Sequence, residues 1–423
     1  MLINVDSTIH TTQFVSSPEA CAMLGIRRET LYAYASRGLV RSYPSAGKGR
    51  GRMYLRDDIL RLKARHDARS GHGPVAAGAL RWGEPVLDSS ITEMTVDGPR
   101  YRGMLATDLV ARGASFEQVA ELLWSGGGVL PPTSPHWPTA AIPEAELAPL
   151  AARTRRPLAR MPLLLAAWQA HSSFGRSRRG ASPPSAEATR RLARSLIAAL
   201  PWIVNPARWP DAAPRTARVA ERICLLLNRS AQPARVRLID AALVLCADHE
   251  LTVSSFAARV VASSGADLYA VLLAAASAFS GPLHGTASEA VEALVEDIPQ
   301  PHRAKRMAAG YAMRGEAIPG FGHHLYRQGD PRGRVLLDLS TEAAGDKREL
   351  RILNALVEAA EPLGQHPSVD VALVAAAYAL GAPKGTASTL FALGRAAGLV
   401  AHALEQRESG VLIRPRARYI SPG

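Results

Sequence analysis

Hydrophobic residues along this chain recur in long runs rich in alanine, leucine and valine. Two examples are DAALVLCADHE at residues 240–250 and VDVALVAAAYALG at residues 369–381. Alanine and leucine head the helix-propensity scale, and the apolar–polar alternation that marks a half-buried strand is scarce. The pattern therefore predicts a mostly α fold whose core is built from closely packed helices.

The first seventy residues carry a pattern of their own. The sequence SSPE at residues 16–19 is typical of a helix start with Ser16 or Ser17 as N-cap, and Gly25 is placed to end that helix. A second helix, RRETLYAYASRG, is predicted to end at Gly38. Two short helices around a glycine-containing turn indicate a helix-turn-helix. A glycine-rich basic hairpin and a further helix are predicted to follow.

Residues 12–69 resemble the winged helix-turn-helix of the MerR/excisionase-like group. The resemblance implies a DNA-binding face on the second helix and the hairpin tip, with candidate contacts from Arg27, Arg28, Thr30, Tyr32, Lys48, Arg50 and Arg52. Between residues 27 and 69 the chain has twelve Arg or Lys and four acidic residues, which suits an anionic partner. The alternative interpretation is a small helical appendage whose basic face is only solvated.

Length and composition also predict how the chain divides into domains and in which cellular compartment it works. The 423 residues predict a helix-turn-helix module at 1–70, a linker of small and polar residues at 71–81, and a main body at 82–423. The net charge of +13 rests on an arginine bias that genome composition alone can also produce. The three cysteines are odd in number and far apart, which predicts neither disulfides nor a metal site. Without a recognisable secretory signal or membrane helix, we expect a reduced, cytoplasmic protein.

The main body gathers histidines, one acid and several arginines in glycine- and alanine-rich surroundings. Taken singly each has a plain explanation, such as a helix N-terminal acid for Asp370 or a paired structural cation for Arg395. Taken together they suit a site where arginines bind a small polyanion while an acid and a histidine move protons beside a carbonyl. The candidate residues are His249, His284, His323, Arg327, Arg332, Asp370, Arg395 and Arg414.

Six motifs, in this order, resemble the citrate synthase family. They are ADHEL, GPLHGTASEAV, PGFGHHLYRQGDPR, SVDVALVAAAYALG, FALGRAAGLVAH and IRPRA, and the segment at residues 89–126 resembles the family's opening segment. The resemblance covers roughly residues 82–420 and is weak across 127–235. It implies a large helical domain interrupted by a smaller one at roughly residues 280–380, with the winged helix-turn-helix module ahead of both.

The resemblance also implies a role for each candidate residue. His284 would polarise the acetyl-CoA thioester, Asp370 would remove the methyl proton, and His323 would polarise the oxaloacetate ketone. Arg327 is a candidate for the CoA phosphates. The oxaloacetate carboxylates would be bound by His249, Arg332, Arg395 and, from the neighbouring subunit of a homodimer, Arg414. Acetyl-CoA is then a co-substrate, and no permanently bound cofactor or metal is implied.

These roles imply condensation of acetyl-CoA with oxaloacetate and hydrolysis of the thioester to citrate and CoA. Two alternatives stay open: a 2-methylcitrate synthase that uses propionyl-CoA, and a DNA-binding regulator whose body senses a metabolite. Thr286, Ser288 and Val371 depart from the family's pattern, and they bear on the acyl-CoA pocket rather than on the charged residues. If the backbone at position 286 needs a positive φ, Thr286 would be strained.

Overall fold

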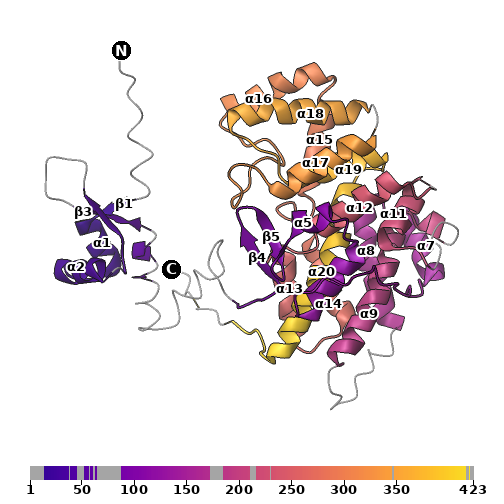
Figure 1. Ribbon diagram of the computed structural model, residues 1–423, viewed down its shortest axis with the longest axis horizontal. Helices are drawn as coiled ribbons and strands as arrows, with labels where there is room; N and C mark the ends of the chain where they lie inside the picture. Colours follow the sequence, from indigo (N-terminus) through magenta and orange to yellow (C-terminus); the bar gives the residue numbers. More distant parts are fainter. Residues whose placement is uncertain are drawn as a thin grey trace. The chain divides into compact units, whose positions relative to one another are not determined.

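The computed structural model describes residues 14–37, 39–44, 52–56, 58–60, 62–63, 87–171, 184–209, 216–228, 230–344, 347–415 and 419. The chain divides into two compact units (Figure 1). One unit comprises Met1–Asp88 with Arg414–Gly423, and the other comprises Ser89–Ile413.

The N-terminal unit is a small sheet with two helices. Its elements are β1 Phe14–Ser16, α1 Ser17–Leu24, α2 Arg28–Ser36, β2 Ser42–Pro44 and β3 Arg52–Leu55. The strands are antiparallel in the order β1-β3-β2, and the described residues between 56 and 63 are helical. A separate apolar core holds the unit together, formed by Val15, Ala20, Leu24, Leu31, Val40, Tyr54 and Ile59.

The predicted helix-turn-helix is confirmed, with details that the sequence left open. Ser16 is the N-cap of α1 and forms a capping box with Glu19, and Gly25 ends the helix in the left-handed region at φ 63°. Helix α2 ends at Ser36, before the predicted end at Gly38, which lies outside the described residues. Strand β1 was not predicted, because three residues are too short to show an alternating pattern.

The larger unit is almost wholly helical, as predicted. A three-stranded antiparallel sheet opens it, formed by β4 Thr92–Thr95, β5 Gly98–Tyr101 and β6 Met104–Leu105. The α-helices are α5 Ala106–Ala111, α6 Phe116–Ser125, α7 Glu144–Arg153, α8 Arg160–His171, α9 Ala186–Ala199, α11 Val219–Asn228, α12 Pro233–Leu245, α13 Val253–Ser263, α14 Leu268–Ala278, α15 Ala287–Asp297, α16 Ala304–Met313, α17 Pro331–Ala344, α18 Arg348–Ala360, α19 Val369–Leu380 and α20 Thr386–Ser409. Short 3-10 helices are η1 Pro157–Ala159, η3 Leu200–Ile203, η4 Pro206–Arg208, η5 Pro301–Arg303 and η6 Glu361–Leu363.

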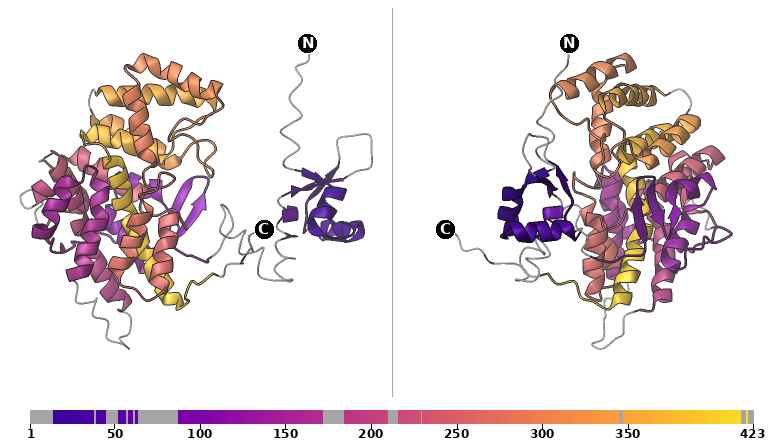
Figure 2. Two further views of the ribbon diagram at one scale, coloured as in Figure 1. Left: turned by 180° about the vertical axis from the view of Figure 1, so that it is seen from behind. Right: turned by 60° about the vertical axis from the view of Figure 1, so that its left-hand side comes forward.

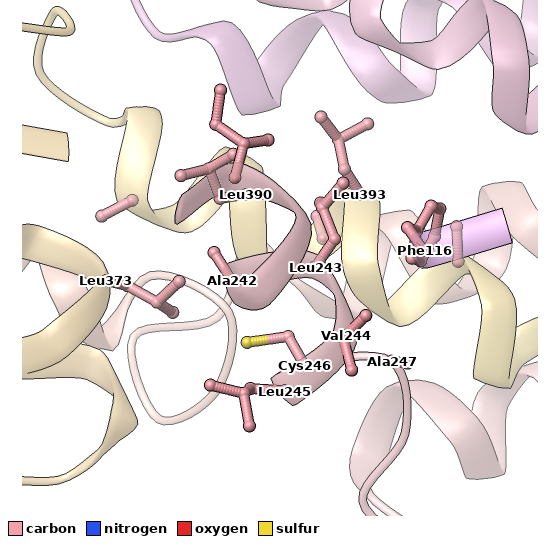
Figure 3. Close-up of a cluster of buried hydrophobic side chains, with 14 of the residues drawn as sticks. Phe116, Ala242, Leu243, Val244, Leu245, Cys246, Ala247, Leu373, Leu390 and Leu393 are labelled. Atoms are coloured by element: carbon pink, nitrogen blue, oxygen red, sulfur yellow. The ribbon is translucent and has the colours of Figure 1, made fainter. Parts of the chain in front are cut away.

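Helix α20 forms the centre of this unit. Figure 3 shows side chains of residues 242–247 gathered with Leu373 of α19 and with Leu390 and Leu393 of α20. A Cβ added at Gly394 would lie 2.6 Å from the Leu243 carbonyl oxygen, so only glycine permits this close approach of α20 to the end of α12. Helix α20 is long and apolar enough to cross a membrane, but 89% of its apolar window is buried, as in a core helix.

Helices α15 to α19 gather at one end of the larger unit (Figures 1 and 2). They span residues 287–380, which overlaps the small subdomain predicted at roughly 280–380. The loop between α16 and α17 carries the two adjacent histidines, and α19 begins next to that loop, since Ser368 N donates to the Gly320 carbonyl at 2.9 Å. The arrangement brings motifs that are distant in sequence to one place.

Candidate active site

Two histidines from different elements face one another at the core of the site. His249 follows the end of α12, and His323 lies in the loop between α16 and α17, with ring centroids 5.6 Å apart. The ring of Tyr326 lies 4.8 Å from His323 and 6.1 Å from His249. The Nε2 atom of His249 and the Tyr326 hydroxyl are buried and have no hydrogen-bond partner among the described residues. These two atoms are therefore available to a bound ligand or water.

Arg332, in the first turn of α17, is buried beside these rings and is paired with Asp330, the last residue of the preceding loop. Its Nε and one terminal nitrogen donate to the two carboxylate oxygens of Asp330 at 3.0 and 2.7 Å. Its guanidinium lies 5.8 Å from the Tyr326 ring centroid. Asp330 also accepts the backbone N–H of Val369, at 3.2 Å, and so ties this loop to the start of α19.

Arg395 is a second buried arginine, with a different environment. It donates to the Cys246 carbonyl at 3.0 Å and to Thr252 Oγ1 at 3.2 Å, and its guanidinium lies 4.8 Å from the Phe391 ring centroid. In the part of the chain that the structure describes, these acceptors are neutral and no carboxylate pairs with it. Burial lowers its pKa, although the Asp248 carboxylate opposes the shift. A buried cation whose hydrogen-bond acceptors are neutral favours an anionic ligand.

His284 lies between two aromatic rings and a serine. Its Nε2 is 2.8 Å from Ser254 Oγ, and its ring centroid lies 5.6 Å from Phe279 and 5.7 Å from Phe391. Burial, with a smaller contribution from Arg395, lowers the pKa of His284 to about 4, so the ring is neutral near pH 7. If the Ser254 hydroxyl donates to Nε2, the single ring proton is on Nδ1, which can donate to a substrate.

Asp370 occupies the first turn of α19, as the sequence pattern indicated. Ser368 is the N-cap, and its hydroxyl accepts from the Asp370 N–H at 3.1 Å and donates to Asp370 Oδ2 at 3.4 Å. Burial is the largest influence on this carboxyl and raises its pKa to about 6, while Arg332 opposes the shift. A carboxylate with a pKa close to neutrality is a suitable general base.

The protonation of His323 follows from its neighbours. Its Nδ1 accepts the backbone N–H of Leu325 at 3.1 Å, so the neutral ring carries its proton on Nε2. Burial lowers the pKa of His323, and Arg332 adds to the shift. Burial, with the charges of Arg332 and Arg395, also holds the pKa of His249 well below its ordinary value. Both rings are therefore neutral hydrogen-bonding groups near pH 7.

The backbone after His284 is not strained. Thr286 has a φ of −108°, so the strain that a positive φ would cause does not arise. Its hydroxyl donates to the Gly281 carbonyl at 3.2 Å, and Ser288 is buried with its Oγ 2.8 Å from Ser388 Oγ. Both departures from the family's pattern are thus accommodated by hydrogen bonds.

The other predicted residues are exposed or half-buried where the structure describes them. Arg327 is exposed in the loop before α17, and Arg414 is exposed and belongs to the other compact unit. Lys48 and Arg50 lie outside the described residues. The remaining DNA-contact candidates are in or beside α2 and β3: Arg27, Arg28, Tyr32 and Arg52 are exposed, and Thr30 is half-buried. The guanidinium of Arg28 lies 5.7 Å from the Tyr32 ring centroid.

Sequence reasoning missed several groups that complete the site. Ser254, Tyr326, Asp330 and Phe391 contact the predicted residues, and of these only Ser254 lies outside every quoted motif. Their roles depend on tertiary contacts rather than on spacing along the chain. Among the described residues, no group of three or more His, Cys, Asp or Glu side chains is placed to hold a metal ion.

Fold and side-chain contacts together define a helical protein in which neutral histidines, a carboxylate and buried arginines influence one another's pKa. A sequence profile described as the citrate synthase C-terminal domain matches residues 79–416, and a helix-turn-helix profile matches residues 14–67. The chain belongs to the citrate synthase family and carries an N-terminal helix-turn-helix domain.

Named relatives and a solved structure are similar over most of the chain. A putative citrate synthase 2 of Mycobacterium tuberculosis strain H37Rv is 31% identical over 363 residues, covering 81% of this chain and 92% of that protein. A 2-methylcitrate synthase of the Erdman strain is 33% identical over 343 residues, covering 75% and 84%. The crystal structure of citrate synthase from Pyrobaculum aerophilum has a TM-score of 0.69 at 28% identity, covering 83% and 94%.

Proposed function

We propose that this chain is an acyltransferase that condenses acetyl-CoA with oxaloacetate and hydrolyses the resulting thioester to citrate and CoA. The observation that carries the proposal is Arg395, a buried cation with neutral hydrogen-bond acceptors whose charge helps to lower the pKa of His249. The Nε2 atom of His249 has no partner among the described residues. A bound dicarboxylate supplies the missing negative charge and an acceptor for the second buried arginine, Arg332. Family membership supports the same substrate class.

The chemistry begins with the acetyl methyl group. The Asp370 carboxylate takes a methyl proton while His284, through Nδ1–H, donates a hydrogen bond to the thioester oxygen as it gains negative charge. The carbon of the resulting enolate attacks the ketone carbon of oxaloacetate, and the ketone oxygen, polarised by His323 Nε2–H, takes that proton as the carbon–carbon bond forms. Water then cleaves the thioester and releases CoA. No permanently bound cofactor takes part in this scheme.

The test of this proposal is oxaloacetate-dependent release of the CoA thiol. Asp370→Asn keeps the shape of the side chain but removes the base, so we expect kcat to fall by about 10²–10⁴-fold. Asp338→Asn, an exposed acid on α17, is the matched control and should leave kcat unchanged. No thiol release by the wild-type chain with oxaloacetate and either acetyl-CoA or propionyl-CoA would refute the proposal.

Propionyl-CoA is the alternative acyl donor. One relative named above is a 2-methylcitrate synthase, and the acyl pocket beside Val371 departs from the family's pattern. A difference of one methylene in an apolar pocket is worth about 1–3 kcal/mol of discrimination. Comparing kcat/KM for the two donors in one preparation identifies the physiological one, because their ratio does not depend on the fraction of active protein.

We further propose that the working unit is a cytoplasmic homodimer in which Arg414 of one subunit completes the site of the other. Mixing Arg414→Ala and Asp370→Asn chains tests this arrangement after dissociation and reassembly. If Arg414 acts across the interface, half of the dimers regain one intact site, and activity returns to about a quarter of wild type. If Arg414 acts within its own chain, no mixed dimer has an intact site and no activity returns.

DNA binding by the N-terminal unit is a second candidate function. The helix-turn-helix match and the exposed Arg27, Arg28 and Arg52 support it. We expect binding to DNA from the region upstream of the chain's own reading frame, with affinity that falls steeply as salt is raised. The double variant Arg27→Ala, Arg28→Ala should weaken binding and leave thiol release unchanged. Absence of binding at low and high salt would contradict this function.

A further inference from the structure

A chain of buried polar groups lies directly behind the turn that carries His249. His402 of α20 places Nε2 3.1 Å from Asp248 Oδ1, and Arg259 Nε of α13 donates to the other ring nitrogen, Nδ1, at 2.9 Å. Asp248, His402 and Arg259 are at most 2% exposed. Beyond them, Arg259 pairs with Glu405 and donates to Gln406 Oε1 at 3.3 Å and Ser89 Oγ at 3.2 Å.

The geometry fixes which group donates and which accepts in each hydrogen bond from Arg259 through His402 to Asp248. The guanidinium of Arg259 always carries hydrogen on Nε, so Nδ1 of His402 must be the acceptor. The neutral ring then has its proton on Nε2 and donates to Asp248 Oδ1. The second oxygen, Asp248 Oδ2, accepts the backbone N–H of Glu250 at 3.0 Å. The carboxylate thus connects the interior of α20 to the turn on the far side of His249.

That turn has an unusual backbone. Glu250 has a φ of 59°, in the left-handed region that non-glycine residues rarely adopt. Its N–H is held by Asp248, which is itself held by His402. The Gly398 N–H donates to the Ala247 carbonyl at 2.9 Å, and a Cβ at Gly398 would collide with Asp248 Oδ1. The turn is thus held on both sides of His249, by Asp248 and by the backbone of α20.

We infer that His402 is a positioning residue for the keto-acid site, acting through Asp248 to hold the His249 turn in its binding conformation. The inference rests on the proposed function, because it assigns His249 to oxaloacetate. His402 touches no substrate in this account. A misplacement of His249 by a fraction of an ångström weakens oxaloacetate binding, while the acyl-CoA groups around His284 stay in place.

Two substitutions of similar size separate positioning from simple packing. The amide oxygen of His402→Asn can replace Nδ1 as the acceptor for Arg259. The amide nitrogen of this shorter side chain does not reach the position of Nε2 and therefore cannot donate to Asp248. The longer His402→Gln can place its amide nitrogen where Nε2 lies and keep that donor. We expect the Asn variant to raise KM for oxaloacetate about tenfold or more, with KM for acyl-CoA within about twofold, and the Gln variant to restore both. Calorimetric titration of oxaloacetate should show the same loss of affinity.

A control variant on the same helix measures general damage. Arg407 donates to Thr189 Oγ1 at 3.1 Å and to the Ala266 carbonyl at 2.7 Å, away from Asp248. Arg407→Met should lower the melting temperature without changing either KM. The inference would be overturned if the Asn and Gln variants of His402 had the same KM for oxaloacetate. It would also be overturned if KM for oxaloacetate and KM for acyl-CoA rose together.

Two further outcomes are also decisive. If His402→Asn does not fold, Asp248→Asn replaces it, since an amide nitrogen facing the Nε2–H of His402 breaks the same bond, and the same KM split is expected. Loss of the fold in both variants would assign the network to stability alone and overturn the inference. A wild-type chain that neither releases thiol nor binds oxaloacetate refutes the proposed function instead, and this outcome is distinguished by measuring the wild type first.

Discussion

Asp370 and His284 differ in protonation because burial acts on an acid and on a base in opposite ways. Loss of water disfavours the charged form, which raises the pKa of Asp370 to about 6 and lowers that of His284 to about 4. Near pH 7 the proposed base, Asp370, is therefore mostly ionised while the proposed donor, His284, is neutral. Deprotonation at carbon with stabilisation at oxygen requires this combination.

The pH dependence of the reaction follows from these directions. Because the base must be ionised, kcat/KM should rise with pH and reach half its plateau near pH 6. His284 is already neutral above about pH 4 and adds no inflection in this range. A pH–rate profile between pH 5 and 8 tests the expectation. A plateau that extends unchanged down to pH 5 would show that Asp370 does not limit the reaction.

The two buried arginines should respond differently to the same substitution. Arg332→Met leaves the Asp330 carboxylate buried without its cation and should lower the free energy of unfolding by about 3–5 kcal/mol. Arg395→Met leaves no unpaired carboxylate and should cost about 2 kcal/mol less. Both variants should raise KM for oxaloacetate by at least about 100-fold. Urea titrations and steady-state kinetics measure the two effects, and equal stability losses would contradict the assigned environments.

Among individual residues, the sequence predicted the charged members of the site but not the side chains that contact them. Motifs identified His249, His323, Arg332 and Arg395, which the structure brings into one cluster. Ser254, at hydrogen-bonding distance from His284, is thirty positions away from it and has no motif of its own. That Arg395 forms no ion pair with a carboxylate among the described residues could not be foreseen either, because pairing depends on how the helices pack.

Helices begin and end where the local sequence specifies it. The capping box at Ser16 and the left-handed Gly25 delimit α1 as predicted, because both act within one turn of the chain. Strands β4 to β6 and β1 were not predicted individually, since each is four residues long or shorter and is stabilised by pairing. Local chemistry therefore defined the helices, whereas the small sheets depend on tertiary context.

The contact between α12 and α20 should tolerate no side chain at Gly394. Gly394→Ala forces its Cβ against the Leu243 carbonyl and should lower the free energy of unfolding by about 1–3 kcal/mol. Gly310→Ala in α16 is the matched control, because its Cβ meets only the flexible end of Arg314. The control should be neutral or stabilising by up to about 1 kcal/mol, the helix-propensity gain over glycine. Thermal melts of both variants measure this difference in stability. Equal melting temperatures for Gly394→Ala and Gly310→Ala would show that α12 and α20 are not closely packed at Gly394.

For the molecule as a whole, a buried carboxyl on α6 makes stability depend on pH. Glu117 at the start of α6 accepts the Val219 N–H at 2.7 Å, and its Oε2 has no hydrogen-bond partner among the described residues. Burial, with the nearby Asp240 carboxylate, raises its pKa from 4.5 to about 7. The folded state thus holds a proton that the unfolded chain releases, so stability falls as pH rises from about 4.5 through about 7.

Glu117→Gln removes this dependence while keeping the oxygen that accepts from Val219. At pH 8 we expect the variant to exceed the wild type by about 1–3 kcal/mol in free energy of unfolding. At pH 5 the two should agree within about 0.5 kcal/mol. Glu342→Gln, an exposed site on α17, should show no such difference at either pH. If the free energy of unfolding changed with pH in the same way for wild type and Glu117→Gln between pH 5 and 8, the assignment would be contradicted.

The most direct test of the central claim is product analysis by mass spectrometry after incubation with oxaloacetate and carbon-labelled acetyl-CoA. The proposed chemistry predicts one labelled citrate for each CoA released, and none from Asp370→Asn. Release of CoA together with labelled acetate and no citrate would show thioester hydrolysis without condensation, and would contradict the account.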